Sequence, residues 1–108
     1  MADDVTVQDL AAAIERGDPV VDVRTPMEYA SGHVPTALLL PMQLVPQRYE
    51  ELRDAPGPVY VICEVGSRSA RVVEFLATVG IDAANVAGGT AQWRALGWPL
   101  DLGGDGTA

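Results

Sequence analysis

A buried strand, a glycine-containing loop and a helix follow one another without a gap in the middle of the chain. The apolar run Val59–Ile62 is typical of a buried strand, and Ser69–Ala77 has the pattern of a helix. Between them, the loop Cys63–Arg68 must turn the chain tightly, and Gly66 permits such a turn. A strand that enters a helix through such a loop directs backbone N–H groups at whatever occupies the loop. The stretch therefore predicts an anion-binding loop in an α/β fold.

Cys63 is the only cysteine among the 108 residues, and it stands at the start of this loop. The N-terminus of the following helix and Arg68 both favour an anion there, so we expect the thiol to lose its proton more easily than a free cysteine. A lone cysteine at a strand end is usually a small buried hydrophobic residue. Here Gly66, the following helix and Arg68 favour a nucleophile instead.

The composition describes one folded domain and excludes several partners. Hydrophobic residues make up 48 % of the chain and the mean hydropathy is +0.13, which is enough for a packed core. The net charge is -8 without any run of basic residues, so we expect no nucleic-acid partner. One cysteine and one histidine exclude a zinc site of nitrogen and sulfur ligands, and nothing in the sequence suggests another metal or a cofactor.

Two further features bear on location. No apolar stretch approaches the roughly 20 residues that cross a bilayer, and the acidic start Met1–Asp4 lacks the pattern of a signal peptide. A single cysteine cannot form an internal disulfide, which fits a reducing compartment. We therefore expect a cytoplasmic protein with no membrane partner.

Strand and helix patterns alternate along the chain. The predicted strands are Val5–Val7, Pro19–Arg24, Ala37–Leu40, Val59–Ile62 and Ala84–Ala87, and the predicted helices are Gln8–Arg16, Pro26–Ser31, Leu44–Leu52, Ser69–Ala77 and Ala91–Leu96. This alternation predicts a three-layer α/β fold, with a central parallel sheet of four to five strands and helices on both faces. Ligands bind such sheets at the carboxyl ends of the strands. Cys63, Arg24 and the Gly88–Gly89 turn fall at such ends, so we expect them to meet.

Local signals indicate where several helices begin. Thr6 and the pair Gln8–Asp9 are both candidates for the start of the first helix. Thr25 is the predicted cap of the second helix, with Pro26 at its first position. Thr90 is the predicted cap of the last helix.

Three segments follow one another along the chain: Asp22–Arg24 with Glu28–Ala37, then Cys63–Ser69, then Val86–Gly89 with Trp93 and Gly97–Leu100. With these segments the chain resembles a single-domain rhodanese, whose fold is shared with Cdc25-type phosphatases, over nearly everything from Val5 to Leu100. We accordingly place a rhodanese-like domain at residues 5–100, an acidic N-terminal tail at 1–4 and a flexible Gly-rich tail at 101–108.

The resemblance implies a sulfurtransferase reaction. Cys63 would take the outer sulfur of a donor such as thiosulfate, become a persulfide, and pass that sulfur to a thiophilic acceptor, which is cyanide, a thiol or a partner protein. The implied substrate-binding residues are those of the loop: Glu64, Val65, Gly66, Ser67 and Arg68. Four residues separate Cys63 from Arg68, as in the sulfurtransferases, whereas the phosphatase-like branch has one residue more and a wider loop.

Three positions depart from the family pattern. Glu64 adds a negative charge beside the nucleophile, which should weaken the binding of a small dianion such as thiosulfate. We predict modest thiosulfate activity that rises when this charge is removed. Thr36 and Leu39 stand where the family commonly has Gly and Asn, and we expect changes in packing there.

Several other polar residues have competing interpretations. We interpret Asp22, Arg24, Glu28 and His33 as structural contacts around the loop, with His33 as a general base the minority hypothesis. Arg68 has a structural alternative of its own, as the ion-pair partner of Glu28 or Asp22.

Four functions compete. The leading hypothesis is a sulfurtransferase that uses a Cys63 persulfide. The second is a persulfide carrier or sulfur-sensing module with little independent turnover, which Glu64 and the acidic surface favour. The third is a cysteine-dependent phosphatase or arsenate reductase, against which the short loop argues. The fourth is an inactive interaction domain, which the presence of both Cys63 and Arg68 disfavours.

Overall fold

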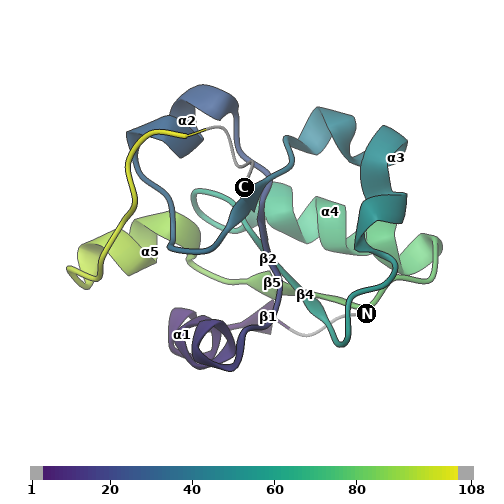
Figure 1. Ribbon diagram of the computed structural model, residues 1–108, viewed down its shortest axis with the longest axis horizontal. Helices are drawn as coiled ribbons and strands as arrows, with labels where there is room; N and C mark the ends of the chain where they lie inside the picture. Colours follow the sequence, from purple (N-terminus) through teal and green to yellow (C-terminus); the bar gives the residue numbers. More distant parts are fainter. Residues whose placement is uncertain (1–3, 105–108) are drawn as a thin grey trace.

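The computed structural model describes residues 4–104, which form a five-stranded parallel sheet in the order β1-β5-β4-β2-β3 (Figure 1). The strands are β1 (Asp4–Val5), β2 (Val20–Asp22), β3 (Leu38–Leu39), β4 (Val59–Ile62) and β5 (Ala83–Val86). The helices are α1 (Val7–Arg16), α2 (Pro26–Ser31), α3 (Val45–Arg48), α4 (Ser67–Thr78) and α5 (Gly89–Ala95). The predicted α/β fold is confirmed, and the sheet has the larger of the two expected strand numbers.

Two apolar clusters cover the two faces of the sheet, so the domain has three layers. One cluster joins the sheet to α3 and α4, and the other joins it to α1 and α5. Along β4, Val59 and Val61 belong to the first cluster, while Tyr60 and Ile62 belong to the second. A central parallel strand is buried on both faces, which explains why its sequence is apolar at every position.

The strand order places a topological switch point between β2 and β4. From β2 the chain moves outward to β3 and then returns to the other side of β2 to form β4. Loops that leave neighbouring strands in opposite directions open a crevice at their carboxyl ends. Arg24 follows β2 and Cys63 follows β4, so both lie at the carboxyl ends of the two strands that flank the switch point.

Thr6, one of the two predicted starts of the first helix, and Thr25, the predicted cap of the second, both cap their helices, while Val7, predicted as strand, belongs to α1. Thr6 caps α1: its hydroxyl accepts from the N–H of Asp9 at 3.0 Å, and the Asp9 carboxylate accepts from the N–H of Thr6 at 3.0 Å. Thr25 and Glu28 form the same reciprocal pair at α2, with Pro26 at the first helical position. These capping boxes satisfy N–H groups that a helix leaves unpaired.

The single helix predicted over Leu44–Leu52 is wrong. The segment consists of a 3₁₀ turn at Met42–Leu44, the four-residue α3 and a second 3₁₀ turn at Tyr49–Leu52. None of these pieces has a side-chain cap, and Arg48 leaves the helical region with a φ of -126°. Val45, Tyr49 and Leu52 still pack in the core, because burial depends on spacing more than on an unbroken hydrogen-bond pattern, whereas Leu44 is exposed.

The ordered domain extends beyond the predicted residues 5–100. Asp4, predicted to lie in the tail, is part of β1 and pairs with Asn85. Asp101 exchanges two backbone hydrogen bonds with His33, at 2.9 Å and 2.8 Å, and Gly103 donates to the carbonyl of Ala30. The rest of the predicted tails, residues 1–3 and 105–108, lie outside the described residues.

Within residues 4–104, no helix combines the length and apolar character needed to cross a membrane.

Candidate active site

Cys63, Arg24 and the Gly88–Gly89 turn meet at the carboxyl ends of three strands, as predicted. The Arg24 guanidinium donates from Nη1 to the carboxylate of Glu64 at 3.1 Å. Gly89 lies directly against the carbonyls of Cys63 and Glu64. The three segments therefore form one site around the loop.

Residues at the N-terminus of α5 form hydrogen bonds with the first two residues of the loop. The N–H and the hydroxyl of Thr90 both donate to the carbonyl of Cys63, at 2.9 Å and 3.0 Å, and the N–H of Ala91 donates to the carbonyl of Glu64 at 3.0 Å. The prediction that Thr90 caps α5 is wrong: the cap is Gly88, which has no side chain to offer. Anchoring these two carbonyls fixes the backbone of the loop, which leaves its N–H groups free to face the sulfur.

The Cys63 sulfur is fully buried and surrounded by hydrogen-bond donors. The N–H of Gly66 donates to Sγ at 3.1 Å, and the hydroxyl of Ser69 lies 3.3 Å from it. Burial raises the pKa of the thiol, but hydrogen bonds from Ser69 and from the N–H groups of Gly66 and Val65 outweigh it and set the pKa below its ordinary value. The direction agrees with the prediction, and Ser69 is a contributor that sequence reasoning did not single out.

Arg68 is turned toward α2. Its two terminal nitrogens donate to the two carboxylate oxygens of Glu28, at 2.8 Å and 2.9 Å. The hydrogen bonds from Arg68 are the main reason why the pKa of Glu28 falls to about 2. Of the two partners considered for Arg68, the structure selects Glu28, and the ion pair ties the end of the loop to α2.

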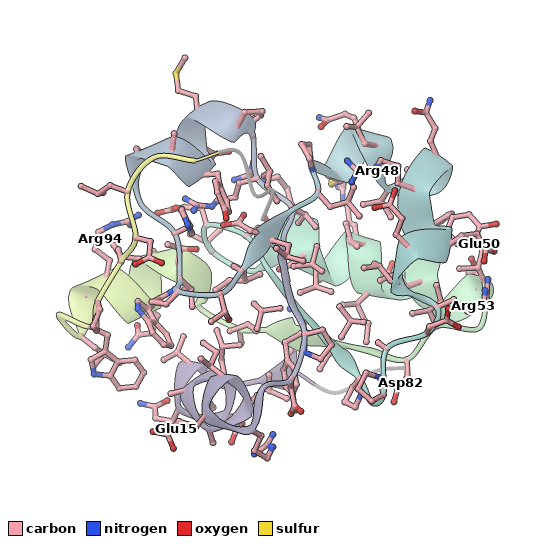
Figure 2. All side chains as sticks on the ribbon, viewed as in Figure 1. Glu15, Arg48, Glu50, Arg53, Asp82 and Arg94 are labelled. Carbon is pink, nitrogen blue, oxygen red and sulfur yellow. The ribbon has the colours of Figure 1, made fainter. Side chains whose placement is uncertain are left out.

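The Glu64 carboxylate, predicted to add a negative charge beside the nucleophile, is paired with an arginine at each of its two oxygens. One oxygen accepts from Arg24 at 3.1 Å and the other accepts from Arg94 at 2.8 Å. Figure 2 shows Arg94 on α5, on the side of the molecule away from Arg48 and Arg53. Arg94 comes from 30 residues further along the chain, so no local pattern could have indicated its role.

Arg24 is itself held by Asp22. Both residues are buried, and the Asp22 carboxylate accepts from Nε and Nη2 of Arg24 at 2.9–3.1 Å. Nη2 also donates to the carbonyl of Gly32 at 2.8 Å. This guanidinium has a partner on every side, so its geometry fits the structural role expected from the sequence.

His33 lies just beyond α2 and contacts that helix. Its Nδ1 lies 2.8 Å from the carbonyl of Tyr29, and the two rings stack with centroids 3.6 Å apart. Because a carbonyl only accepts, Nδ1 carries the proton in this contact. The backbone of His33 pairs with Asp101, so the residue joins α2 to the segment that follows α5.

The remaining loop residues differ in exposure. Gly66 donates its N–H to the sulfur and adopts a φ of +105°, which glycine allows. Val65 exposes 62 % of its surface at the edge of the loop, and Ser67 is exposed at the start of α4. Among the described residues there is no group of three or more His, Cys, Asp or Glu side chains that could hold a metal ion.

Thr36 departs from the family pattern in its backbone. We expected a change in packing, but its side chain is exposed and its φ is +74°. Within residues 4–104 it is the only residue other than glycine with positive φ. The conformation suits a glycine, which the family commonly has at this position.

The fold and the site define an α/β protein with a cysteine among hydrogen-bond donors in a loop between a strand and a helix, and comparison with known proteins places it more narrowly. Residues 6–96 match the rhodanese-like domain family. A sulfurtransferase of Allochromatium vinosum is 38 % identical over 82 residues, which cover 75 % of this chain and 76 % of that protein. The chain therefore belongs to the rhodanese-like family.

A second relative and a solved structure agree with this placement. The thiosulfate sulfurtransferase GlpE of Haemophilus influenzae is 31 % identical over 99 residues, which cover 91 % of this chain and 93 % of that protein. The crystal structure of a rhodanese-related protein from Thermoplasma volcanium matches with a TM-score of 0.83 at 33 % identity, over 92 % of this chain and 97 % of that one. The match extends the resemblance from sequence to the whole three-layer fold.

Proposed function

We propose that the protein is a sulfurtransferase that carries a sulfane sulfur as a persulfide on Cys63. The observation that supports this most directly is the environment of the Cys63 sulfur. In a chain of the rhodanese-like family, the sulfur lies among donors from Gly66 and Ser69, which favour its anionic form.

The reaction has two steps. In the first, the Cys63 thiolate attacks the outer sulfur of thiosulfate, the sulfur–sulfur bond of the donor breaks, and sulfite leaves with the electron pair. In the second, cyanide, a thiolate or a partner protein attacks the outer sulfur of the persulfide, and the electron pair returns to Cys63 as a thiolate. Neither step needs a cofactor, because the attacking nucleophile supplies the electron pair of the new bond and the leaving group takes the pair of the broken S–S bond.

The loop supplies binding and charge stabilisation. The N–H groups of Glu64 to Arg68 are the proposed ligands of the anionic persulfide. Arg68 and Glu28 fix the end of this loop, and Thr90 fixes its start. A preorganised set of donors stabilises the charge without rearranging when the sulfur arrives.

A persulfide carrier with a protein acceptor is the second candidate, and the accessibility of the loop favours it. Cys63 is fully buried, whereas Val65 at the edge of the loop is 62 % exposed. An acceptor must displace part of these surroundings to touch the sulfur, and a protein that docks on Val65 has the binding energy to do so.

The test is to incubate the protein with thiosulfate and to measure its intact mass. We expect one added sulfur of about 32 Da on the wild type and none on Cys63→Ser. No mass gain with several sulfane donors would overturn both sulfur hypotheses. Turnover with cyanide then separates an enzyme from a carrier, and turnover of p-nitrophenyl phosphate would favour the phosphatase alternative.

A further inference from the structure

A chain of buried polar side chains leads away from the Cys63 sulfur toward the edge of the sheet. The hydroxyl of Ser69 lies 3.3 Å from Sγ and forms a short hydrogen bond with Oδ1 of Asn85 on β5. Nδ2 of Asn85 donates to the carbonyl of Gly66 at 3.2 Å and to the carboxylate of Asp4 on β1 at 3.1 Å. Ser69 and Asn85 are 0 % and 4 % exposed, so water does not substitute for these contacts freely.

The orientation of the Asn85 amide follows from its neighbours. The Gly66 carbonyl and the Asp4 carboxylate are both acceptors, so the amide must turn its NH₂ group toward them. Its oxygen then faces Ser69 and accepts the only proton that the hydroxyl has to give. A Cys63 thiolate would need the same proton in order to accept a hydrogen bond from Ser69.

We propose that Asn85 competes with the Cys63 sulfur for the single proton of the Ser69 hydroxyl, and so acts as a positioning residue that restrains ionisation of the thiol. When Cys63 is a thiol, S–H donates to Oγ of Ser69, and the hydroxyl donates onward to Asn85, so every group is satisfied. When the thiol loses its proton to water, the hydroxyl must rotate toward the sulfur, and Oδ1 of Asn85 is left without a donor.

The competition also follows the sulfur through the proposed reaction, and in this respect it rests on the proposed function. In the persulfide, the charge lies on the outer sulfur, and the inner Sγ becomes a weak acceptor. The Ser69 proton then returns to Asn85. When the acceptor attacks the outer sulfur, the S–S bond breaks and the electron pair returns to Sγ. The thiolate then accepts a hydrogen bond from the Ser69 hydroxyl again.

Other charged groups near the sulfur are paired and stay constant in the test. Arg68 on α4 is held by Glu28 of α2, and Arg24 after β2 is held by Asp22 and Glu64. Asp4 on β1 reaches the sulfur only through Asn85 and Ser69. Replacing Asn85 by an apolar residue leaves the arginine pairs in place, but it also removes the Nδ2 donor to Asp4 and Gly66, a loss that is the same with and without Ser69.

The experiment measures the pH dependence of alkylation of Cys63 by iodoacetamide, an uncharged reagent. The chain has one cysteine, so intact mass reports this thiol alone. The midpoint of the rate against pH gives the pKa independently of how accessible the sulfur is. We expect Asn85→Leu to shift the midpoint down and to raise the alkylation rate about fivefold at pH values below it, because one contested hydrogen bond is released to the thiolate.

A double-mutant cycle separates competition for the proton from a general loosening of the loop. Ser69→Ala should raise the midpoint, and in that background Asn85→Leu should have no further effect on it. An equal shift with and without Ser69 would overturn the proposal, because Asn85 would then act through Gly66 alone. No shift, or an upward shift, for Asn85→Leu with Ser69 present would overturn it as well.

Two controls complete the design. Asn85→Val, which suits a strand, replaces Asn85→Leu if the latter does not fold. Leu10→Ala leaves a cavity in the cluster on the other face of the sheet, so it should lower stability without moving the midpoint. The alkylation readout needs no sulfur donor, so it tests this proposal even if the protein forms no persulfide.

Discussion

The guanidinium of Arg68 and the carboxylate of Glu28 meet in a two-point ion pair, with N–O distances of 2.8 Å and 2.9 Å. Glu28 also accepts from the N–H of Thr25 at 3.0 Å, which closes the capping box of α2. One carboxylate therefore caps a helix and holds the last residue of the loop. A change in its charge should affect both.

This pair should make stability depend on pH in a defined window. The pKa of Glu28 is about 2 in the folded protein against 4.5 for the unperturbed group, so its contribution is complete above pH 4.5 and is lost as the pH falls toward 2. We expect Glu28→Gln to lower the free energy of unfolding at pH 7 by about 1–2 kcal/mol, a value discounted because both side chains are about one-third exposed.

Urea unfolding at pH 7, 5 and 3.5 measures this effect. The difference between wild type and Glu28→Gln should be largest at pH 7 and should shrink at pH 3.5. Glu74→Gln, a change at an exposed position on α4, is the matched control and should show no such trend. A difference between wild type and Glu28→Gln that stays constant with pH would show that the ion pair contributes no stability.

Gly89 approaches the loop so closely that a side chain cannot fit. A Cβ there would lie 2.5 Å from the carbonyl oxygen of Glu64 and 2.6 Å from that of Cys63. Both obstacles are backbone, so Gly89→Ala must push the loop away from α5. We expect it to cost about 3 kcal/mol or more of stability and to disrupt the loop around the sulfur.

Gly97 provides a matched comparison for this substitution. It also has a positive φ, +73°, but an added Cβ would meet nothing within 4 Å. Gly97→Ala should therefore lower the free energy of unfolding only by the backbone strain of alanine at this φ, about 1 kcal/mol. Urea denaturation of the two variants checks the difference, and equal losses would show that strain rather than close approach governs Gly89.

What the sequence predicted well is local in the chain. The bounds of β4 and the caps Thr6 and Thr25 follow from neighbouring residues, since an apolar run or a threonine before a helix acts within a few positions. The place of Cys63 at a strand end followed from the alternation of strands and helices. These features depend on short-range physics, which a single sequence contains.

The polar contacts around the sulfur could not be predicted in this way. Thr90 reaches the Cys63 carbonyl across 27 positions, Asn85 reaches Ser69 across 16, and Arg94 reaches Glu64 across 30. Which polar groups become partners depends on how the elements pack, and threonine, asparagine and arginine are ordinary residues in any helix or strand. The same reason explains why the pairing of Glu64 with Arg24 and Arg94 was not predicted.

The backbone conformation of Thr36 should lower the free energy of unfolding, and a single substitution should recover this loss. A β-branched residue at a φ of +74° is strained, while glycine adopts this conformation without cost. We expect Thr36→Gly to raise the free energy of unfolding by about 1 kcal/mol, net of the larger entropy of glycine in the unfolded chain. For a chain of this size that is a rise in Tm of about 4–8 °C.

Thermal unfolding followed by circular dichroism measures this gain. Thr36→Ala keeps a Cβ at the same φ, so it should recover only part of the gain. A Tm for Thr36→Gly at or below the wild-type value would mean that the Thr36 side chain has a stabilising contact that outweighs its backbone strain.

Glu64 remains the residue that should tune the choice of sulfur donor, although its carboxylate is paired. With Glu64→Gln, the guanidinium groups of Arg24 and Arg94 keep their positions but lose the negative charge between them. At a separation of about 8 Å in water, one charge and a dianion interact by about 1 kcal/mol, so we expect kcat/KM for thiosulfate to rise about fivefold, mainly through a lower KM. High salt should reduce this gain because it screens the interaction.

An uncharged organic polysulfide donor should show no gain with Glu64→Gln, and Glu74→Gln should show no gain with thiosulfate. A fall in kcat/KM for Glu64→Gln would instead show that its ion pairs hold the loop in its active shape, and that this support outweighs the repulsion.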